Sequence, residues 1–476
     1  MYTATFKRRN EMRKIVALFM IAVFFLSACG TSDVEIVPEY DISSNSTDLG
    51  GFTLDWGFSM SVYSENTDNV FGYIPGTEFA DTVSERKKQV ENDLNCKISV
   101  FNDSNSSVIR SKLNAAIAGG AHLFDLATAD SSAISPFARA GSLYGLTSLL
   151  DVENTDKWGT PSMLMPMLWK NDLYGVLPFA WPNLLYSFAG HIIAVNENII
   201  TRLGEPDPRE YVEALEWTWD KFEECLVKYA YQESDRTVYA FQSHPDYFAM
   251  NMSLSNGVSM VYAEDGDVSV GIYTEAGREA LERAQAIYLR DGKPYIHPSN
   301  TTASGELLVN GEAVMISTGH GSLISTAGSI LYVMDNVGVL PFPQGPRATP
   351  GVYPSYYQQI PYVTTIPITS NDPQAAAMIL SAMYEPFEGL ENKDAIADYM
   401  NKQIFFDDRD AYIIINMIEH TEYNYFWEGG RDGIANVISS GKPVSYVLES
   451  YESAYQQLIE NYIYPQYLGR VAVYGK

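Results

Sequence analysis

Strand-like and helix-like segments alternate along the body of the chain. Residues 52–56 alternate apolar and polar side chains, which is typical of a half-buried strand. Residues 81–95 form a charged segment with apolar positions at helical spacing, and residues 97–101 alternate again. This strand–helix–strand order predicts a βαβ unit.

The same unit then repeats. A helix is predicted from Ser106 or Ser107, either of which can cap it, to the pair Gly119-Gly120, followed by a buried strand at 123–127. Two β-rich runs, 258–263 and 268–270, flank Asp265-Gly266 and predict a hairpin. Further strands are expected at 173–177 and 192–195, and further helices at 136–140, 219–229, 274–289, 372–384 and 444–462. We therefore expect α/β lobes with largely parallel sheets.

The N-terminus predicts export. A basic segment, Lys7 to Lys14, precedes twelve apolar residues at 15–26. Twelve residues span only about 18 Å of helix, whereas a bilayer core is about 30 Å thick, so a permanent transmembrane helix is not expected. The following Leu-Ser-Ala-Cys resembles the bacterial lipobox, which predicts a signal peptide at 1–28 and a lipid on Cys29. A buried strand ending in an incidental cysteine is the alternative, and translation starts at either Met1 or Met12.

The exported part is strongly acidic. Removal of residues 1–28 takes away five basic residues and one acidic residue, so the net charge changes from −28 to −32. Such a charge repels a phosphate backbone and makes nucleic acid an unsuitable partner. Residues 29–49 are rich in Ser, Asp, Asn and Thr and are expected to form a flexible tether. Cys96 and Cys225 are interpreted as separate buried thiols, with a disulfide as the alternative.

Catalytic and metal-binding motifs are missing from the sequence. It contains no H-E-x-x-H, C-x-x-C, G-x-S-x-G or Walker loop. Its histidines are scattered singly, and Asp265-Gly266-Asp267 does not continue as a calcium loop. We therefore expect no enzyme, no cofactor and no metal. A hidden pair of glycosidase carboxylates stays open as an alternative, since only spatial separation would identify it.

Several short motifs occur in one particular order. They are Leu113 to Gly120 (LNAAIAGG), Phe124 to Leu126 (FDL), Leu173 to Phe179 (LYGVLPF), Trp217 to Phe222 (WTWDKF), Asn310 to Met315 (NGEAVM), Gly338 to Pro343 (GVLPFP), Asn371 to Ala377 (NDPQAAA) and Phe426-Trp427. Together with the lipobox, this series resembles the family 1 extracellular solute-binding proteins, which include the maltodextrin receptor. The resemblance covers nearly all of residues 50–465.

The resemblance implies a two-lobed periplasmic-binding-protein-like fold of type II, with three crossings between lobes and a C-terminal helical segment. The crossings are expected near 187–192, 313–317 and 364–368. One lobe would comprise residues 50–187 plus 317–364, and the other residues 190–313 plus 368–476. The implied function is a monomeric, lipid-anchored receptor on the extracytoplasmic face of a bacterial cell membrane. It would capture a carbohydrate, by analogy an oligosaccharide, and deliver it to the transmembrane subunits of an ABC importer.

Aromatic platforms and hydrogen-bonding side chains at strand ends suit a sugar. By analogy with the family, the expected ligand-binding residues are Trp56, Asp130, Trp181, Asn183, His320, Tyr357 and Trp427. Trp217 and Trp219, in a Thr-Trp-Asp helix start, are interpreted as packing residues. A surface glycan-degrading enzyme is the alternative function, and so is a receptor of this fold for a peptide or for sensing.

Overall fold

A computed structural model gives the structure of the protein. It describes residues 48–59, 71, 73, 78–103, 105–177, 179, 181, 189–233, 236–264, 267–297, 305–319, 323, 330–357, 361–405, 407–423 and 431–475. The expected signal peptide, the lipidation site Cys29 and residues 29–47 of the expected tether lie outside these residues. Leu49, the last residue of the expected tether, instead donates a backbone hydrogen bond to the carbonyl of Leu94 at 2.9 Å. Within them, no helix combines the length and the apolar character needed to cross a membrane.

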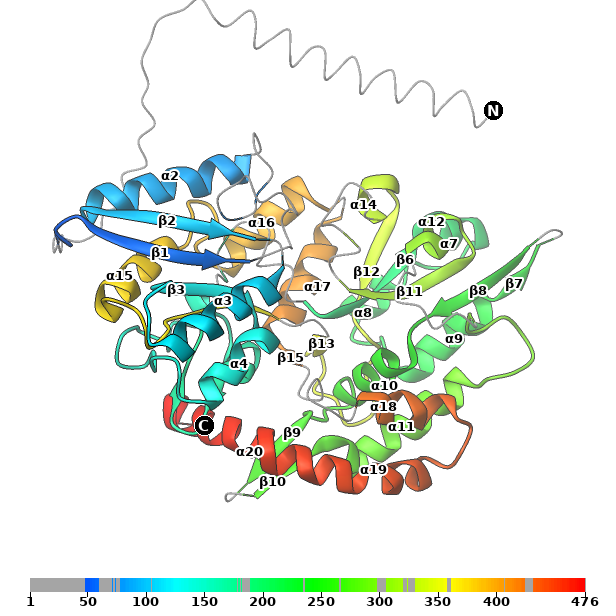
Figure 1. Ribbon diagram of the computed structural model, residues 1–476. Coiled ribbons are helices and arrows are strands. Elements are labelled where there is room, and N and C mark those ends of the chain that lie inside the picture. Colours follow the sequence, from blue (N-terminus) through cyan, green and yellow to red (C-terminus); the bar gives the residue numbers. More distant parts are fainter. Residues whose placement is uncertain are drawn as a thin grey trace, which may run out of the picture. The chain divides into compact units, whose positions relative to one another are not determined.

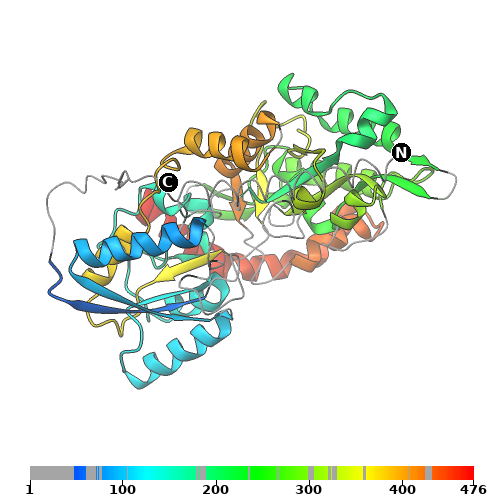
Figure 2. The same ribbon diagram turned by 90° about the horizontal axis from the view of Figure 1, so that it is seen from above.

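The first sheet has the strand order β14-β3-β1-β2. Its strands are β1 (Phe52–Phe58), β2 (Cys96–Asn102), β3 (Leu126–Asp130) and β14 (Tyr362–Thr365). β1 pairs in parallel with β2 and β3, which confirms the βαβ prediction, and β14 joins β3 in antiparallel. Helices α2 (Glu78–Asp93) and α3 (Ser106–Gly119) lie on opposite faces of this sheet (Figures 1 and 2). Both faces are thus covered, as a parallel sheet requires.

Local chemistry sets the ends of α3. The side chain of Asn105 accepts a hydrogen bond from the backbone N–H of Ser107, so Asn105, one residue before the predicted cap, begins the helix. At the other end Gly120 has φ of 61°, a left-handed conformation that glycine adopts without a Cβ penalty. The helix therefore ends where the Gly-Gly pair predicts.

The second sheet has the order β12-β6-β11-β8-β7 and a mixed pairing. Its strands are β6 (His191–Asn196), β7 (Tyr231–Gln232), β8 (Thr237–Gln242), β11 (Ala313–Gly319) and β12 (Val337–Leu340). Only β11 and β8 run parallel, while β6 runs antiparallel to both β11 and β12. The expectation of largely parallel sheets is therefore wrong for this sheet. Strand burial does not reveal direction, because every residue of β6 and β12 is buried.

The strand pairings also correct the expected lobe boundaries. Residues 317–364 were assigned to the first lobe, yet β12 hydrogen-bonds to β6 in the second sheet. Conversely, residues 368–476 were assigned to the second lobe, whereas α15 (Pro373–Met383) packs against α2 beside the first sheet. The chain returns to the first sheet only at β14. The family motifs show the order of segments but not which strand each segment pairs with.

The remaining elements are short strands and helices. The paired strands are β4 (Leu168–Trp169) with β5 (Asp172–Leu173), β9 (Val261–Glu264) with β10 (Asp267–Val270), and β13 (Ser355–Tyr357) with β15 (Thr421–Tyr423). The antiparallel pairing of β9 with β10 confirms the hairpin, although the turn residues themselves lie outside the described part. The helices are α4 (Ser131–Arg139), α5 (Thr155–Trp158), α6 (Pro161–Leu164), α7 (Glu197–Leu203), α8 (Arg209–Glu213), α9 (Trp219–Tyr229), α10 (Pro245–Leu254), α11 (Glu275–Tyr288), α12 (Gly305–Val309), α14 (Ile330–Val333), α16 (Lys393–Gln403), α17 (Asp408–Glu419), α18 (Arg431–Ser439), α19 (Val444–Leu458) and α20 (Tyr464–Tyr474).

The C-terminal helices connect the two parts of the fold. α19 packs against α11 and α18, whereas α20 packs against β4 and β5. A π-helical turn, Ile459–Ile463, joins α19 to α20. The backbone N–H of Lys170 donates to the carbonyl of Pro465 at 2.7 Å, and Gly469 lies directly against the backbone of Trp169. Because a Cβ at Gly469 would come within 2.7 Å of the Trp169 nitrogen, this close approach requires glycine.

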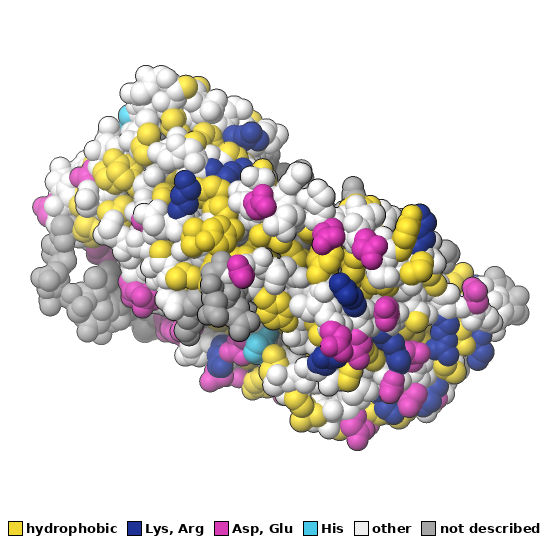
Figure 3. Space-filling model, turned by 90° about the horizontal axis from the view of Figure 1, so that it is seen from below, with side chains coloured by type: hydrophobic (Ala, Val, Ile, Leu, Met, Phe, Trp, Pro, Cys, Tyr) yellow, Lys and Arg dark blue, Asp and Glu magenta, His cyan; other side chains and the backbone are white. Residues whose placement is uncertain are grey.

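Charged side chains of both signs lie intermixed on the face that Figure 3 shows. The same intermixing is visible in individual ion pairs. Arg283 contacts both Asp220 and Glu223, and Arg347 contacts both Glu275 and Glu279. The acidic excess is thus partly balanced locally, because single arginines bridge two carboxylates.

Candidate ligand-binding site

Trp56 and Trp181 belong to one cluster of buried rings beside the first sheet. This aromatic cluster consists of Trp56, Phe58, Phe71, Trp181 and Tyr384. Trp181 contacts the rings of Phe71 and Tyr384 edge to face, with centroids 5.1 and 5.0 Å apart. All five side chains are fully buried. The structure therefore brings two of the expected ligand-binding residues together, and it uses both rings for packing in this conformation.

Hydrogen bonds hold both indoles in place. Trp56 Nε1 donates to Thr128 Oγ1 at 2.8 Å, and the Thr128 hydroxyl lies 2.7 Å from that of Thr364. The Thr364 hydroxyl in turn lies 2.6 Å from the Tyr384 hydroxyl, whose pKa burial raises well above its ordinary value. Trp181 Nε1 donates to the carbonyl of Met383 at 2.9 Å. This chain of contacts ties β1, β3 and β14 to the end of α15.

Asp130 and Tyr357 both lie at strand ends, the position expected for Asp130. Asp130 ends β3 and caps α4, since its Oδ1 accepts hydrogen bonds from the backbone N–H of Ala133 and from Ser132 Oγ. Tyr357 ends β13, which pairs in parallel with β15, and its side chain is buried. The other expected ligand-binding residues, Asn183, His320 and Trp427, lie outside the described residues.

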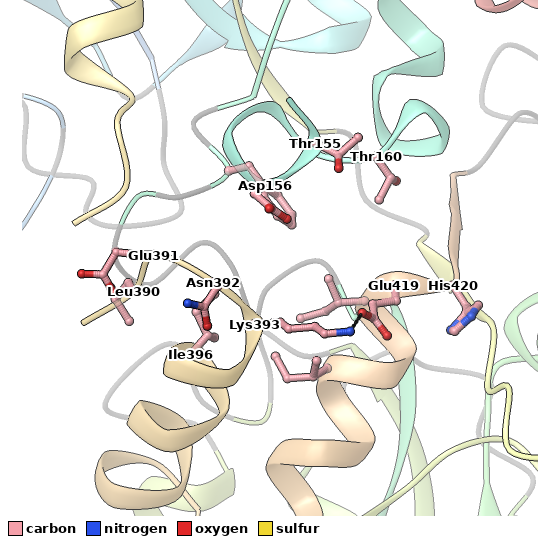
Figure 4. Close-up of a pocket in the computed structure, with 13 residues that line it drawn as sticks. Thr155, Asp156, Thr160, Leu390, Glu391, Asn392, Lys393, Ile396, Glu419 and His420 are labelled. Atoms are coloured by element: carbon pink, nitrogen blue, oxygen red, sulfur yellow. Dashed lines mark hydrogen bonds and ion pairs between the residues drawn. The ribbon is translucent and has the colours of Figure 1, made fainter. Parts of the chain in front are cut away.

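A cavity of about 470 Å³ opens next to α16 and α17 (Figure 4). This volume is within the range of roughly 300–1,000 Å³ that is typical of small-molecule sites. Its lining combines apolar and polar side chains: Thr155, Asp156, Thr160, Phe179, Leu390, Glu391, Asn392, Lys393, Ile396, Ile415, Ile418, Glu419 and His420. None of these residues is among those expected from the sequence.

Elements attached to both sheets line this cavity. On one side, Trp158 of α5 packs against Tyr384, and Lys157 donates to Ser381 Oγ at 2.8 Å and to Glu385. Burial lowers the pKa of Lys157, although Glu385 opposes that shift. On the other side, α17 packs against β12 of the second sheet. The cavity is therefore placed where movement of one sheet relative to the other would change its size.

The polar groups on the α16–α17 side are held by specific contacts. Asn392 Oδ1 accepts from the backbone N–H groups of Asp394 and Ala395 and caps α16. Lys393 Nζ lies 2.7 Å from Glu419 Oε1, which links the start of α16 to the end of α17 (Figure 4). His420 Nδ1 lies 2.7 Å from the Asn416 carbonyl. A carbonyl only accepts, so Nδ1 carries the proton, and Nε2 of a neutral ring is left as an acceptor.

On the opposite wall, Thr160 supplies an unused hydroxyl. Its Oγ1 is buried and has no hydrogen-bond partner among the described residues. An unsatisfied buried hydroxyl is costly, and a polar ligand in the cavity would satisfy it. Such a cavity, with one aromatic ring, several acceptors and a lysine, is chemically suited to a hydroxyl-rich solute.

The cavity residues were missed because they come from segments far apart in sequence. Thr160 and Phe179 precede the second sheet, while α16 and α17 follow α15. The one local signal was the Asn392-Lys393-Asp394 sequence, a typical helix start. That signal predicts a helix but no cavity.

Comparison with known proteins now identifies the family. The model of the bacterial extracellular solute-binding proteins matches residues 87–386, more than half of the chain, and the protein belongs to this family. Members act outside the cytoplasm and bind solutes. No curated protein sequence matches the chain.

Crystal structures of three other proteins are among those that share the fold. A cyclo/maltodextrin-binding protein with bound maltotetraose is 13% identical, with a TM-score of 0.60 over 88% of this chain and 99% of that one. A sugar transporter from Rhizobium etli in an open conformation is 16% identical, with a TM-score of 0.60 over 85% and 99%. The GacH receptor of Streptomyces glaucescens, studied unliganded and with acarbose, is 14% identical, with a TM-score of 0.54 over 87% and 99%. The protein thus has the two-lobed fold of the maltose-binding protein.

Proposed function

We propose that the protein is a lipid-anchored extracytoplasmic receptor that captures an oligosaccharide between its lobes and delivers it to an ABC importer. The observation that carries this proposal is the cavity of about 470 Å³ lined by segments that pack beside both sheets, in a chain of the solute-binding family. The similar structures include proteins crystallised with maltotetraose and acarbose, which favours a sugar. The lipobox around Cys29 supports the anchor.

The two sheets mark the two proposed lobes. The first lobe would contain β1, β2, β3, β14 and α15, and the second would contain β6, β8, β11, β12 and α17. A solute that contacts both lobes stabilises the closed state by its differential affinity for that state. Closure by hinge motion would then provide the signal that importer subunits recognise.

The proposed site combines the cavity with the residues expected from the family. Phe179 offers a ring for the C–H face of a sugar, while Thr160 Oγ1 and His420 Nε2 offer hydrogen bonds to hydroxyls. Asp130, Asn183, His320, Tyr357 and Trp427 remain proposed contacts. Trp56 and Trp181 contact solute only if the aromatic cluster opens, because both rings are fully buried.

A pair of variants on one helix tests the site. Lys393 lines the cavity, whereas Lys402 lies on the same helix outside the cavity lining and is more exposed. We expect Lys393→Ala to weaken the binding of a sugar identified in a thermal-shift screen and Lys402→Ala to leave it unchanged. If both variants bind the sugar with the same affinity, the cavity is not part of the binding site. Release of shorter sugars during the titration would instead indicate a glycan-degrading enzyme.

A further inference from the structure

Three side chains with metal-binding atoms converge beside the first sheet. Asp55 belongs to β1, His122 lies in the loop between α3 and β3, and Asp125 directly precedes β3. Their ligand atoms all lie within 4.8 Å of one another. His122 Nε2 is 3.2 Å from Asp125 Oδ1, and Asp125 is fully buried. This set, the Asp55–His122–Asp125 cluster, is separate from the residues that line the cavity.

Hydrogen bonds fix the buried carboxylate of the cluster. Asp125 Oδ1 accepts from Ser370 Oγ at 3.0 Å and from the backbone N–H of Asn371 at 2.9 Å. Asp125 Oδ2 accepts from the backbone N–H of Asp55 at 3.0 Å. Since Oδ2 accepts only this one bond among the described residues, its second lone pair is available to a cation.

The imidazole of His122 provides an independent observation. Its Nε2 atom is buried and makes no hydrogen bond of acceptable geometry within the described part, although it lies next to the Asp125 carboxylate. A buried nitrogen without a hydrogen bond is costly, and a metal ion would satisfy it.

We propose that Asp55, His122 and Asp125 bind a zinc ion. Zn²⁺ combines imidazole nitrogen with carboxylate oxygen and often takes three protein ligands plus one water. At zinc–ligand distances of about 2.1 Å, tetrahedral geometry separates two ligand atoms by about 3.4 Å, a spacing that atoms already within 4.8 Å of one another reach by small side-chain rotations. Ca²⁺ and Mg²⁺ prefer oxygen ligands alone, so the histidine selects against them.

The bound ion would crosslink three segments of the first sheet. It would join β1 to the loop that precedes β3, and through Asp125 it would hold the Ser370-Asn371 turn that leads into α15. A metal that binds only the folded state stabilises it in proportion to its concentration and affinity. The role is therefore structural, and the sugar affinity of the cavity need not depend on it.

Calorimetric titration of the untagged, chelator-treated protein with ZnCl₂ tests this site. The wild type is expected to bind one zinc ion per chain. His122→Ala and Asp55→Asn are each expected to weaken zinc binding at least about tenfold, because removing even a residue that only hydrogen-bonds to a metal ligand typically costs that much affinity. His244→Ala is the matched control, because His244 contacts Asp246 in another His–Asp pair and no third metal-binding residue joins them in the described part. This control should bind zinc like the wild type.

Cobalt supplies a second readout that does not depend on stability. Co²⁺ in the proposed site should show the intense visible bands of four-coordinate geometry, and His122→Ala should lose them. Melting curves of the chelated variants show whether each one folds without metal. The proposal is overturned if the wild type binds no stoichiometric zinc, or if folded His122→Ala binds it as tightly as the wild type. Failure of sugar binding alone would leave this proposal standing and would contradict only the receptor function.

Discussion

Replacement of Arg209 by methionine should destabilise the protein strongly. Arg209 of α8 is 3% exposed, and its Nη1 lies 3.0 and 3.1 Å from the two carboxylate oxygens of Asp410 in α17. Its other nitrogens donate to Asp207 and Glu197. The backbone N–H of Val339 in β12 also donates to Asp410, at 2.9 Å. Arg209 therefore joins α8 to the cavity-lining helix α17, and Asp410 joins α17 to β12 of the second sheet.

The magnitude follows from the burial of both partners. Asp410 is 1% exposed, and Arg209→Met leaves its carboxylate buried without the arginine. Breaking a buried pair in this way typically costs about 3–5 kcal/mol in the free energy of unfolding. Arg347→Met is the matched control, since Arg347 also contacts two carboxylates but is half exposed. Arg347→Met should lower the free energy of unfolding much less, because solvent screens exposed ion pairs.

The loss in the free energy of unfolding caused by Arg209→Met should also depend on pH. Burial raises the pKa of Asp410 to about 7, although Arg209 opposes that shift. Below that pH the carboxyl of Asp410 is protonated, so the variant leaves no buried anion without a partner. As pH rises through 7, Asp410 ionises in the wild type, where Arg209 pairs with the carboxylate. In the variant the pKa of Asp410 is higher still, so ionising the buried carboxyl costs more and the difference in the free energy of unfolding grows. Urea unfolding should therefore show a larger loss in the free energy of unfolding near pH 8 than near pH 6, two values that lie about one unit above and below that pKa. A loss under about 1 kcal/mol, or one that shrinks as pH rises, would refute the reasoning.

Three further predictions concern packing and thiol reactivity. Cys96 and Cys225 should resist alkylation in the folded protein at neutral pH, because burial raises the pKa of both thiols, that of Cys96 to about 11; mass spectrometry of the native and urea-unfolded protein measures this. Gly469→Val should lower the melting temperature, because the new side chain would press on the backbone of Trp169. Trp181→Ala should reduce the free energy of unfolding by about 3–5 kcal/mol, the usual cost of removing a buried aromatic side chain.

Each of these three predictions has a result that would contradict it. Rapid alkylation of the native thiols would show that they are accessible, and a mass two units lower would reveal a disulfide between them. An unchanged melting temperature for Gly469→Val would mean that α20 can move away from β4 without cost. A loss under about 1 kcal/mol for Trp181→Ala would mean that the aromatic cluster is loosely packed.

Elements with a clear local pattern could be predicted from the sequence. β1, β2 and α9 lie close to their predicted positions because periodicity and caps are local signals. α2 is present but begins three residues before the predicted range 81–95 and ends at Asp93. β3 lies three residues later than predicted, since the apolar run at 123–127 begins before the paired residues. The direction of β6 and the return of the chain through β14 depend on partners distant in sequence, such as Thr364 opposite Thr128. No local pattern encodes such pairings.

The site was harder to predict than the fold. Aromatic residues at strand ends suit both ligand stacking and core packing, and the structure buries Trp56 and Trp181 in the same cluster. The cavity is formed by ends of elements, with Thr160 on one wall and His420 on the other. Only the folding of the chain brings these residues together, because more than half of the chain separates them.

The central claim is that the protein binds a sugar without altering it. A thermal-shift screen of the whole protein against mono- and oligosaccharides, maltotetraose and acarbose included, tests this most directly. A specific sugar at about 100 times its dissociation constant should stabilise the protein by about 2.7 kcal/mol and should be recovered uncut. A screen in which no sugar raises the melting temperature, or in which the active sugar is recovered as shorter products, would contradict the account.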